Sequence, residues 1–343
     1  MSRALNPKVI EALKAGDHNQ VFDEIASILT YDASSPARLE IEILSGFGFD
    51  PSVNVLRTEN AVAIPKLRLV QGFFVARALL QKHAAGIPQE AQARREVRRA
   101  SAVCLMMDAE NLTAANTRKR LLAAEIQNAT GEALQELLWG EKWLLDSILT
   151  SWLHRHTKSP TLWSHRRWLL GQFTAHGLAS EIHAADEIAC VIGPAGEQHP
   201  RNYYAWNHAR GIVTGFPGTA AGELVEVCKK WAWKHHGDVS GWSFLLFVLR
   251  QQEQQQQQQQ RGETSSLTGS VVSETIGLAE SLQWRNESVW WFLWTVVAER
   301  GIEDERKRVV TLGEKLFEDA KRENSRDEKA VWERARKRLS RWG

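Results

Sequence analysis

Cysteine is scarce in this sequence of 343 residues, and its placement excludes two common uses of the residue. The three cysteines, Cys104, Cys190 and Cys228, lie far apart, and no CxxC pair or Cys/His cluster joins them. A disulfide framework and a structural zinc site would each need cysteines in characteristic spacings. We therefore expect a protein of a reducing, intracellular compartment, with no metal ion bound by this chain.

A strong charge of one sign and a long apolar run are also absent. The 43 basic and 41 acidic side chains leave a formal net charge of +2, so no broad field would attract nucleic acid or an anionic membrane. No run approaches the roughly 18 apolar residues that a bilayer-spanning helix needs, and the N-terminal MSRALNPKVI has no signal-peptide core. These absences predict a cytoplasmic protein that neither binds nucleic acid nor inserts into a membrane.

Tryptophan, in contrast, is abundant, with 15 residues, and several of them occur in one recurring context. Aligned on an anchor tryptophan, four segments read SPTLWSHRRWLL, NYYAWNHARGIV, DVSGWSFLLFVL and NESVWWFLWTVV, with anchors at Trp163, Trp206, Trp242 and Trp290. A fifth segment, NLTAANTRKRLL, has Ala115 at the anchor position. Successive anchors are separated by 48, 43, 36 and 48 residues. This spacing indicates internal repeats of variable length.

Each of these segments begins with a residue suited to cap a helix. Four positions before the anchor stand Asn111, Ser159, Asn202, Asp238 and Asn286. Their side chains can accept hydrogen bonds from the free amides of a first helical turn, and Pro160 occupies a first helical position where proline is favoured. From each anchor onward, apolar residues recur every three or four positions, which is typical of a buried helical stripe. Each anchor is therefore predicted to open the inner helix of a helical hairpin.

The remaining segments complete a four-part layout. Residues 1–90 lack the anchor pattern and are predicted to form an N-terminal helical extension, with helices at about 18–30 and 63–84. The repeats occupy 91–250, with second helices predicted over 176–192 and 219–236. The Gln-rich stretch 251–270 is predicted to be a disordered insertion, because it has too little apolar surface to offset the entropy of ordering. Residues 271–343 hold the last repeat and the C-terminal helices.

The repeat segments resemble those of the alpha subunits of protein prenyltransferases, which read approximately Asn-Tyr-x-x-Trp-x-x-Arg, often with His before the Arg. The likeness is strongest over Ser159 to Trp168 and Arg201 to Arg210, and it extends over roughly residues 95–300. Proline replaces the usual tyrosine after Ser159, Ala209 replaces the usual arginine, and the last two units lack the arginine. The resemblance implies an all-α, right-handed α-α superhelix of helical hairpin repeats, whose inner helices line a concave side that embraces a partner.

In that family the alpha subunit works in a heterodimer with a beta subunit, which carries the catalytic zinc. The resemblance therefore implies an enzyme subunit that, with such a partner, transfers a geranylgeranyl or farnesyl group from its diphosphate to a C-terminal cysteine of an acceptor protein. No cofactor is then expected on this chain. Lys158 matches the lysine that reaches the diphosphate and is the candidate catalytic residue. By the same alignment Tyr203, Tyr204 and Arg201 are the candidate substrate-binding residues at the rim of the reaction cleft.

A histidine and an arginine recur after two of the anchors and require a separate interpretation. The same two offsets hold His165 and Arg167 in one repeat, and His208 and Arg210 in the next. A catalytic group has no reason to be duplicated in successive helices, so we interpret these residues as structural. Each arginine is expected on the face of its anchor, stacked on an indole and bonded to the neighbouring hairpin.

A second class of function stays open, namely a non-catalytic helical-repeat scaffold for protein–protein interaction. TPR units, one form of such a scaffold, would keep a steadier period of about 34 residues, whereas the observed spacings run from 36 to 48. The two interpretations differ in where Lys158 and Tyr204 should lie. An open face favours the enzyme subunit, and burial between hairpins favours the scaffold.

Overall fold

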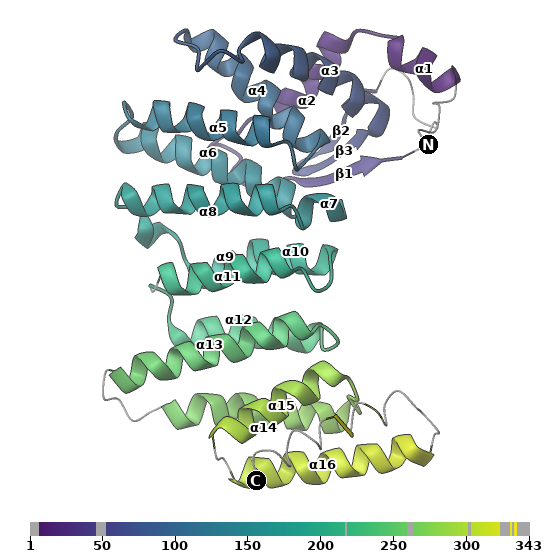
Figure 1. Cartoon of the computed structure of the whole chain (residues 1–343), viewed down its shortest axis with the longest axis vertical. Helices are drawn as coiled ribbons and strands as arrows, with labels where there is room; N and C mark the ends of the chain where they lie inside the picture. Colours follow the sequence, from purple (N-terminus) through teal and green to yellow (C-terminus); the bar gives the residue numbers. More distant parts are fainter. Residues whose placement is uncertain are drawn as a thin grey trace. The chain divides into compact units, whose positions relative to one another are not determined.

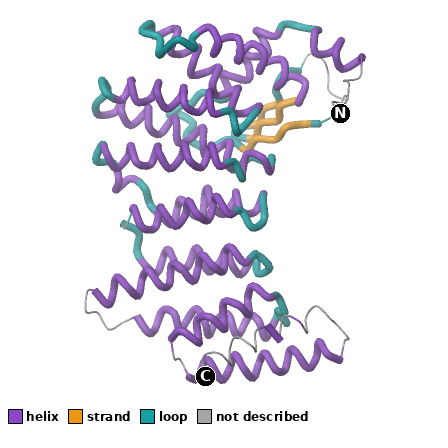
Figure 2. Tube along the Cα trace, viewed as in Figure 1, coloured by secondary structure: helices purple, strands orange, loops and turns teal. Residues whose placement is uncertain are grey.

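Helices make up most of the chain in the computed structural model, which describes residues 7–45, 53–216, 218–258, 264–300, 303–322, 330 and 333–334. The expected all-α helical-repeat class is confirmed, with one small sheet near the N-terminus (Figure 2). The chain divides into two compact units, the first formed by Met1–Glu181 with Pro194–His208 and the second by Ile182–Gly193 with Ala209–Gly343. Each unit is built from helices that pack on their neighbours in sequence.

The first unit opens with α1 (Pro7–Lys14), α2 (His18–Ile28), α3 (Lys66–Lys82) and α4 (Ala91–Met107). Asp17 caps α2 by accepting from the amides of Asn19 and Gln20, at 2.9 and 3.1 Å. Helix α3 packs against both α2 and α4, and Ile25 and Leu69 are fully buried there. The helices predicted over 18–30 and 63–84 thus correspond to α2 and α3.

A three-stranded sheet interrupts this extension, and the prediction of helical stretches over 1–90 did not include it. Strands β1 (Glu40–Leu44), β2 (Leu56–Thr58) and β3 (Ala61–Pro65) follow the order β1-β3-β2, with β1 parallel and β2 antiparallel to β3. Val62 and Ile64 are buried and alternate along β3, as in a strand. This pattern ends at Pro65, and α3 begins at the next residue. The amide of Trp152 donates to the carbonyl of Ile41 at 3.0 Å, which joins β1 to the chain after α6 (Gly131–Leu149).

The inner helices begin where the capping residues predict. They are α5 (Leu112–Ile126), α8 (Pro160–Ala175), α11 (Tyr203–Gly215), α13 (Val239–Gln258) and α15 (Glu287–Arg300), each starting one residue after its predicted cap (Figure 1). The side chains of Asn111, Ser159, Asn202 and Asp238 accept from first-turn amides as expected. Asn286 precedes α15 but places its amide oxygen 2.6 Å from His236 Nδ1.

The anchors are buried, and three of the tryptophans fasten their inner helix to the link before it. Between 0% and 4% of the surface of Trp163, Trp206, Trp242 and Trp290 is exposed, and Ala115 is 1% exposed. The indole N–H donates to the backbone carbonyl six residues earlier, at 2.7 Å for Trp163, 3.0 Å for Trp242 and 2.9 Å for Trp290. At these three positions the tryptophan therefore supplies both buried area and a satisfied polar group.

The second helices vary more than the inner ones. The segment predicted over 219–236 is α12 (Ala221–Lys234), which packs against α13. The segment predicted over 176–192 is instead a 3₁₀ turn (Ala179–Glu181), α9 (Ala184–Glu187), a π-helical turn (Ile188–Ile192) and α10 (Gly193–Gln198). Pro194 gives a physical reason, because it has no N–H to donate to a preceding carbonyl and its ring crowds that carbonyl, so the helix widens.

The Gln-rich stretch is helical where the structure describes it. Helix α13 runs on to Gln258, and α14 (Thr264–Ser281) begins six residues later, so the expectation of a disordered insertion over 251–270 is wrong for both of these parts. Residues 259–263 lie outside the described residues. Glutamine is a good helix former, and it extends a helix already nucleated by the buried turns around Trp242. After α15, α16 (Glu303–Arg322) packs on α14 and α15.

Candidate functional site

The capping residues of α8 and α11 join the links that precede these helices. Ser159 Oγ accepts from the amide of Leu162 at 3.1 Å and donates to the carbonyl of Ala109 at 3.0 Å. Asn202 Nδ2 donates to the carbonyl of Thr157 at 2.7 Å, across 45 residues of sequence. Both caps are 1% exposed. Buried hydrogen bonds therefore hold these links in fixed positions, as a binding site requires.

Lys158 lies at the exposed end of the first of these links. It follows α7 (His154–Thr157), a single helical turn, and directly precedes the buried cap Ser159. Its side chain is exposed and makes no hydrogen bond or ion pair with a described residue. The ammonium group is therefore available to an anion. It lies next to the N-terminal end of α8, where the helix dipole also favours negative charge.

Two histidines meet beside Lys158. His154 Nδ1 and His199 Nδ1 lie 3.2 Å apart, and their rings are 5.3 Å apart at an angle of 77°. Burial lowers the pKa of His199 below its ordinary value, and the positive charges of Lys158 and His154 lower this pKa further. At neutral pH His199 therefore contributes a neutral ring that can donate or accept a hydrogen bond.

Aromatic side chains are unusually open on the same two links. Trp152 is 61% exposed, Tyr203 70% and Tyr204 40%, and the two tyrosine rings lie 5.6 Å apart at 78°. Arg201 is exposed as well, and its φ of 59° places it in the left-handed region that side chains seldom adopt. All four candidate residues are thus exposed: Lys158 and Arg201 lie on the links, and Tyr203 and Tyr204 lie in the first turn of α11. We call the following set the link patch: Trp152, His154, Lys158, His199, Tyr203 and Tyr204.

The buried arginine of α8 is Arg166, and the expectation that Arg167 lies on the anchor's face is wrong. Arg166 has no exposed surface, whereas Arg167 is exposed. Both lie within one turn of Trp163, but α8 is covered on two sides, so only the stripe through Ser164, Arg167 and Gly171 stays open. Tertiary contacts therefore decide which of the two neighbouring arginines is buried.

Helix α6 supplies carboxylates to the helices on both of its sides. Asp146 accepts from Arg166 Nε and from Lys142 Nζ, each at 2.7 Å. Glu141 forms a bidentate pair with Arg118 of α5, at 2.9 and 2.5 Å. Burial raises the pKa values of Glu141 and Asp146, but the neighbouring cations lower these values further, to about 2. Arg118 and Arg166 both stand seven residues after their caps, a shared position that aligning the repeats could have revealed.

The two repeat histidines are buried and neutral, which agrees with a structural interpretation. His208 Nε2 lies 2.8 Å from the guanidinium of Arg166, and burial together with this positive charge holds the pKa of His208 well below its ordinary value. His165 Nε2 lies 3.2 Å from Glu141 Oε1, yet burial lowers the pKa of His165 to about 4. Neither ring reaches the exposed links.

Arg210 lies on the second unit's part of α11 and contacts α13. It donates to Ser243 Oγ at 3.0 Å, and its guanidinium is 5.8 Å from the ring of Phe244 and 5.4 Å from that of Phe247. The expected contact with an aromatic ring is therefore made with phenyl groups rather than with an indole.

The described residues lack two further features. No group of three or more His, Cys, Asp and Glu side chains there is arranged to hold a metal ion. Within the same residues, every helix is too short or too polar to cross a membrane.

Two known protein families match parts of this chain. The family described as "Protein prenyltransferase alpha subunit repeat" matches residues 146–173, which include Lys158, Trp163 and Arg166. The family described as "ECM9 middle domain" matches residues 162–271. The first match covers the link before α8, and the second begins after it.

Similar curated proteins carry the same two descriptions. Protein ECM9 of Saccharomyces cerevisiae is 30% identical over 148 residues, which are 43% of this chain and 38% of that protein. Protein prenyltransferase alpha subunit repeat-containing protein 1 of Homo sapiens is 27% identical over 164 residues, which cover 43% of this chain and 38% of the human protein. Its Xenopus laevis counterpart 1-A is 26% identical, with 35% of its length covered. The chain thus spans little more than a third of these relatives.

Proposed function

This chain belongs to the proteins built from prenyltransferase alpha subunit repeats, and from that premise we propose that it is the alpha-type subunit of a heterodimeric protein prenyltransferase. Its partner would be a beta-type subunit, whose zinc would bind the acceptor cysteine as a thiolate. The substrates would be an isoprenoid diphosphate, geranylgeranyl or farnesyl, and a protein ending in that cysteine. Alone, the chain should be inactive.

The observation that carries this proposal is the open, unpaired ammonium of Lys158. In the transfer, the bond between C1 of the isoprenoid and the diphosphate oxygen breaks while a bond from C1 to sulfur forms, so negative charge builds on the departing diphosphate. A fixed cation aimed at that charge lowers the barrier. Lys158 has no partner among the described residues, and it is held beside the buried cap Ser159.

The rest of the link patch would bind substrate rather than react. Tyr203 and Tyr204 offer hydroxyl groups together with exposed ring surface suited to an isoprenoid or a peptide. His199 offers a neutral hydrogen-bonding ring beside Lys158. The Arg201 side chain adds a second cation on the same link. Both links are fixed by the buried bond from Asn202 to Thr157, so little ordering would be needed on binding.

One observation favours the alternative of a non-catalytic scaffold. The match to the ECM9 middle domain covers 162–271, the longer of the two matched stretches, and does not include Lys158. One relative is named only Protein ECM9, and the human relative is named as a repeat-containing protein rather than as an alpha subunit. In that alternative the exposed aromatic residues of the link patch would contact a partner protein, and Lys158 would be an ordinary surface lysine.

Co-expression with each beta-type prenyltransferase subunit of the same organism tests the proposal. The tagged chain should capture one of these subunits, and the complex should transfer labelled geranylgeranyl or farnesyl diphosphate to cysteine-ended proteins. Lys158→Ala should abolish most transfer without loss of capture. The matched control is Lys66→Ala, since Lys66 is also exposed at the start of a helix. Capture of no beta-type subunit, or transfer that is insensitive to Lys158→Ala, would favour the scaffold.

A further inference from the structure

A cavity of about 520 Å³ lies within the first unit, and no residue of the link patch lines it. Its walls come from the end of α2 and from α4, α5 and α6. The volume is in the usual range for small-molecule sites, about 300–1,000 Å³. Helices α4 and α5 contribute Arg95, Arg98, Arg99 and Arg118, whereas the α2 and α6 sides include the apolar Leu29, Leu137 and Leu144. The cavity therefore combines a cationic wall with apolar ones.

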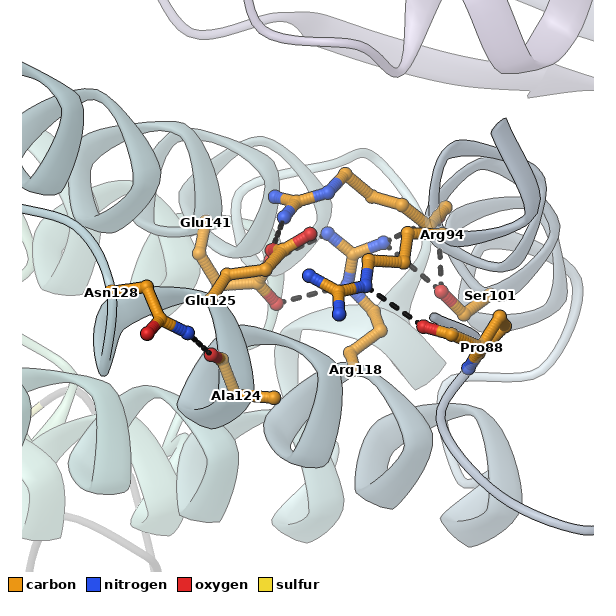
Figure 3. A network of polar contacts seen from close by, with 9 residues as sticks. Pro88, Arg94, Ser101, Arg118, Ala124, Glu125, Asn128 and Glu141 are labelled. Atoms are coloured by element: carbon orange, nitrogen blue, oxygen red, sulfur yellow. Dashed lines mark hydrogen bonds and ion pairs between the residues drawn. The ribbon is translucent and has the colours of Figure 1, made fainter. Parts of the chain in front are cut away.

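Two of these arginines are committed to structural contacts. Arg118 pairs with Glu141 and also donates to the carbonyl of Arg98 at 2.7 Å (Figure 3). Arg99 pairs with Asp23 at 2.9 Å and reaches the Asp23 carbonyl at 3.0 Å. These contacts shape the cavity and leave little hydrogen-bonding capacity for a ligand.

The other two arginines, Arg95 and Arg98, could bind an external anion. Arg95 is exposed at the cavity and makes no hydrogen bond or ion pair with a described residue. Arg98 pairs with Glu125, which itself lines the cavity. An external anion would therefore find one free guanidinium and one whose present partner is a side chain of the cavity wall.

Glu125 is poorly placed for a carboxylate. It is the penultimate residue of α5, where the helix dipole disfavours negative charge. Burial raises the pKa of Glu125, although the charges of Arg98 and Arg94 oppose that shift. Figure 3 shows Arg118 on Glu141 and Arg94 near Glu125, with Arg94 donating to the carbonyl of Pro88 at 2.8 Å. Glu125 thus lies near the positive charges of both Arg98 and Arg94. A second anion could take the place of Glu125 at moderate cost.

The aromatic side of the cavity is fixed by a glycine. A Cβ on Gly140 would lie 3.2 Å from Tyr31 Cδ1. Because residue 140 has no side chain, the Tyr31 ring can lie against α6. Tyr31 also packs on Trp143, with ring centroids 5.8 Å apart. Both Tyr31 and Gly140 line the cavity. The wall that a ligand's apolar part would meet is therefore already formed.

We propose that this cavity binds a phosphate monoester with a small apolar group. The phosphate displaces Glu125 from Arg98 and also contacts Arg95, while the apolar group lies against Tyr31, Leu137 and Leu144. Two guanidinium groups match the charge of about −1.5 to −2 that a phosphate monoester carries at neutral pH. Arginine forms bidentate hydrogen bonds with phosphate, and the second charge of the dianion favours it over a singly charged carboxylate. The site is independent of the proposed transferase function.

Calorimetric titration of the full chain tests the site with three probes. Phenyl phosphate has both the dianion and the apolar group, inorganic phosphate lacks the apolar group, and benzoate lacks the second charge. Phenyl phosphate should bind at least about ten-fold more tightly than either of the others, as expected when a charged hydrogen bond or a buried ring is lost. Its affinity should also fall with added salt.

Three variants with two controls separate the contributions. Arg95→Gln should weaken phenyl phosphate binding about ten-fold without changing the melting temperature, because Arg95 is exposed and unpaired. Arg98→Gln should weaken binding at least as much, whereas Glu125→Gln should tighten binding several-fold by removing the competing carboxylate. Arg120→Gln, an exposed arginine of α5 outside the cavity, and Lys158→Ala should leave binding unchanged.

Each contrary result would overturn a stated part of the proposal. The absence of saturable binding at millimolar phenyl phosphate would refute the site itself. Equal affinity for phenyl phosphate and inorganic phosphate would refute the apolar wall. Binding that is unaffected by Arg95→Gln would refute the contact with Arg95. Binding that is weakened by Glu125→Gln would refute the exchange of Glu125 for the phosphate. A loss on Lys158→Ala would mean that the probe binds at the link patch instead.

Discussion

Replacing Arg166 by methionine tests how the buried side of the repeat is held together. Arg166 has no exposed surface, and it donates to Asp146 at 2.7 Å and lies 2.8 Å from His208. Methionine would fill much of the space but leave Asp146 with Lys142 as its remaining charged partner. Breaking a buried pair by removing one partner costs about 3–5 kcal/mol, and the retained lysine places the expected loss near 3 kcal/mol. That is a large part of the roughly 5–15 kcal/mol that stabilises a typical fold.

The matched control is the adjacent arginine. Arg167 is exposed, so Arg167→Met should change the free energy of unfolding by no more than about 0.5 kcal/mol. Urea titrations followed by far-UV circular dichroism would compare both variants with the unmodified chain. The double variant Arg166→Met with Asp146→Asn should lose less than the sum of the two single losses, because the residues interact directly. Equal losses for Arg166→Met and Arg167→Met would refute the assignment of Arg166 as the buried partner of α6.

Lowering the pH from 6.5 to about 4 should destabilise the fold, because burial holds the pKa of His156 and His165 at about 4, so the unfolded chain binds protons that the folded chain excludes. Unfolding midpoints measured between pH 6.5 and 4 should show this loss of stability, and the loss should be smaller in His165→Leu. Midpoints that do not change with pH would contradict the prediction. Gly241→Ala would place a Cβ 2.3 Å from a ring atom of Trp231, and overpacking of about 1–3 kcal/mol should lower the melting temperature despite the better helix propensity of alanine. Arg201→Gly should raise stability by up to about 1 kcal/mol, because glycine adopts the φ of 59° without strain; a lower melting temperature would contradict this.

Local signals in the sequence predicted the starts of the inner helices. The caps act within one helical turn, so Asn111, Ser159 and Asn202 could be identified from residue type and spacing alone. The choice between Arg166 and Arg167 could not, because both lie near the anchor's face and the decision rests on Asp146, a residue of another helix. Within a single repeat no signal separates the two arginines, and only the comparison of repeats, in which Arg166 and Arg118 share a position, favours Arg166.

Features without a repeat were harder to predict. Strand β3 has five residues and runs directly into α3, so its short alternation was absorbed into the predicted helix over 63–84. The Gln-rich stretch lacks apolar residues, but the helix reaches Gln258 because α13 is nucleated by buried turns before it. The arginine-lined cavity depends on four helices meeting, and no single stretch of sequence indicates it.

The most direct test of Lys158 is the rate of prenyl transfer in a single turnover by the complex with a beta-type subunit. Lys158→Ala should slow transfer by about 10²–10³-fold, the usual effect of removing one group that stabilises charge in the transition state. Lys158→Arg should retain part of the rate, Lys66→Ala should retain all of it, and all three variants should bind the partner as tightly as the unmodified chain. A Lys158→Ala complex that assembles normally and transfers at the rate of the Lys66→Ala complex would contradict a catalytic role for Lys158.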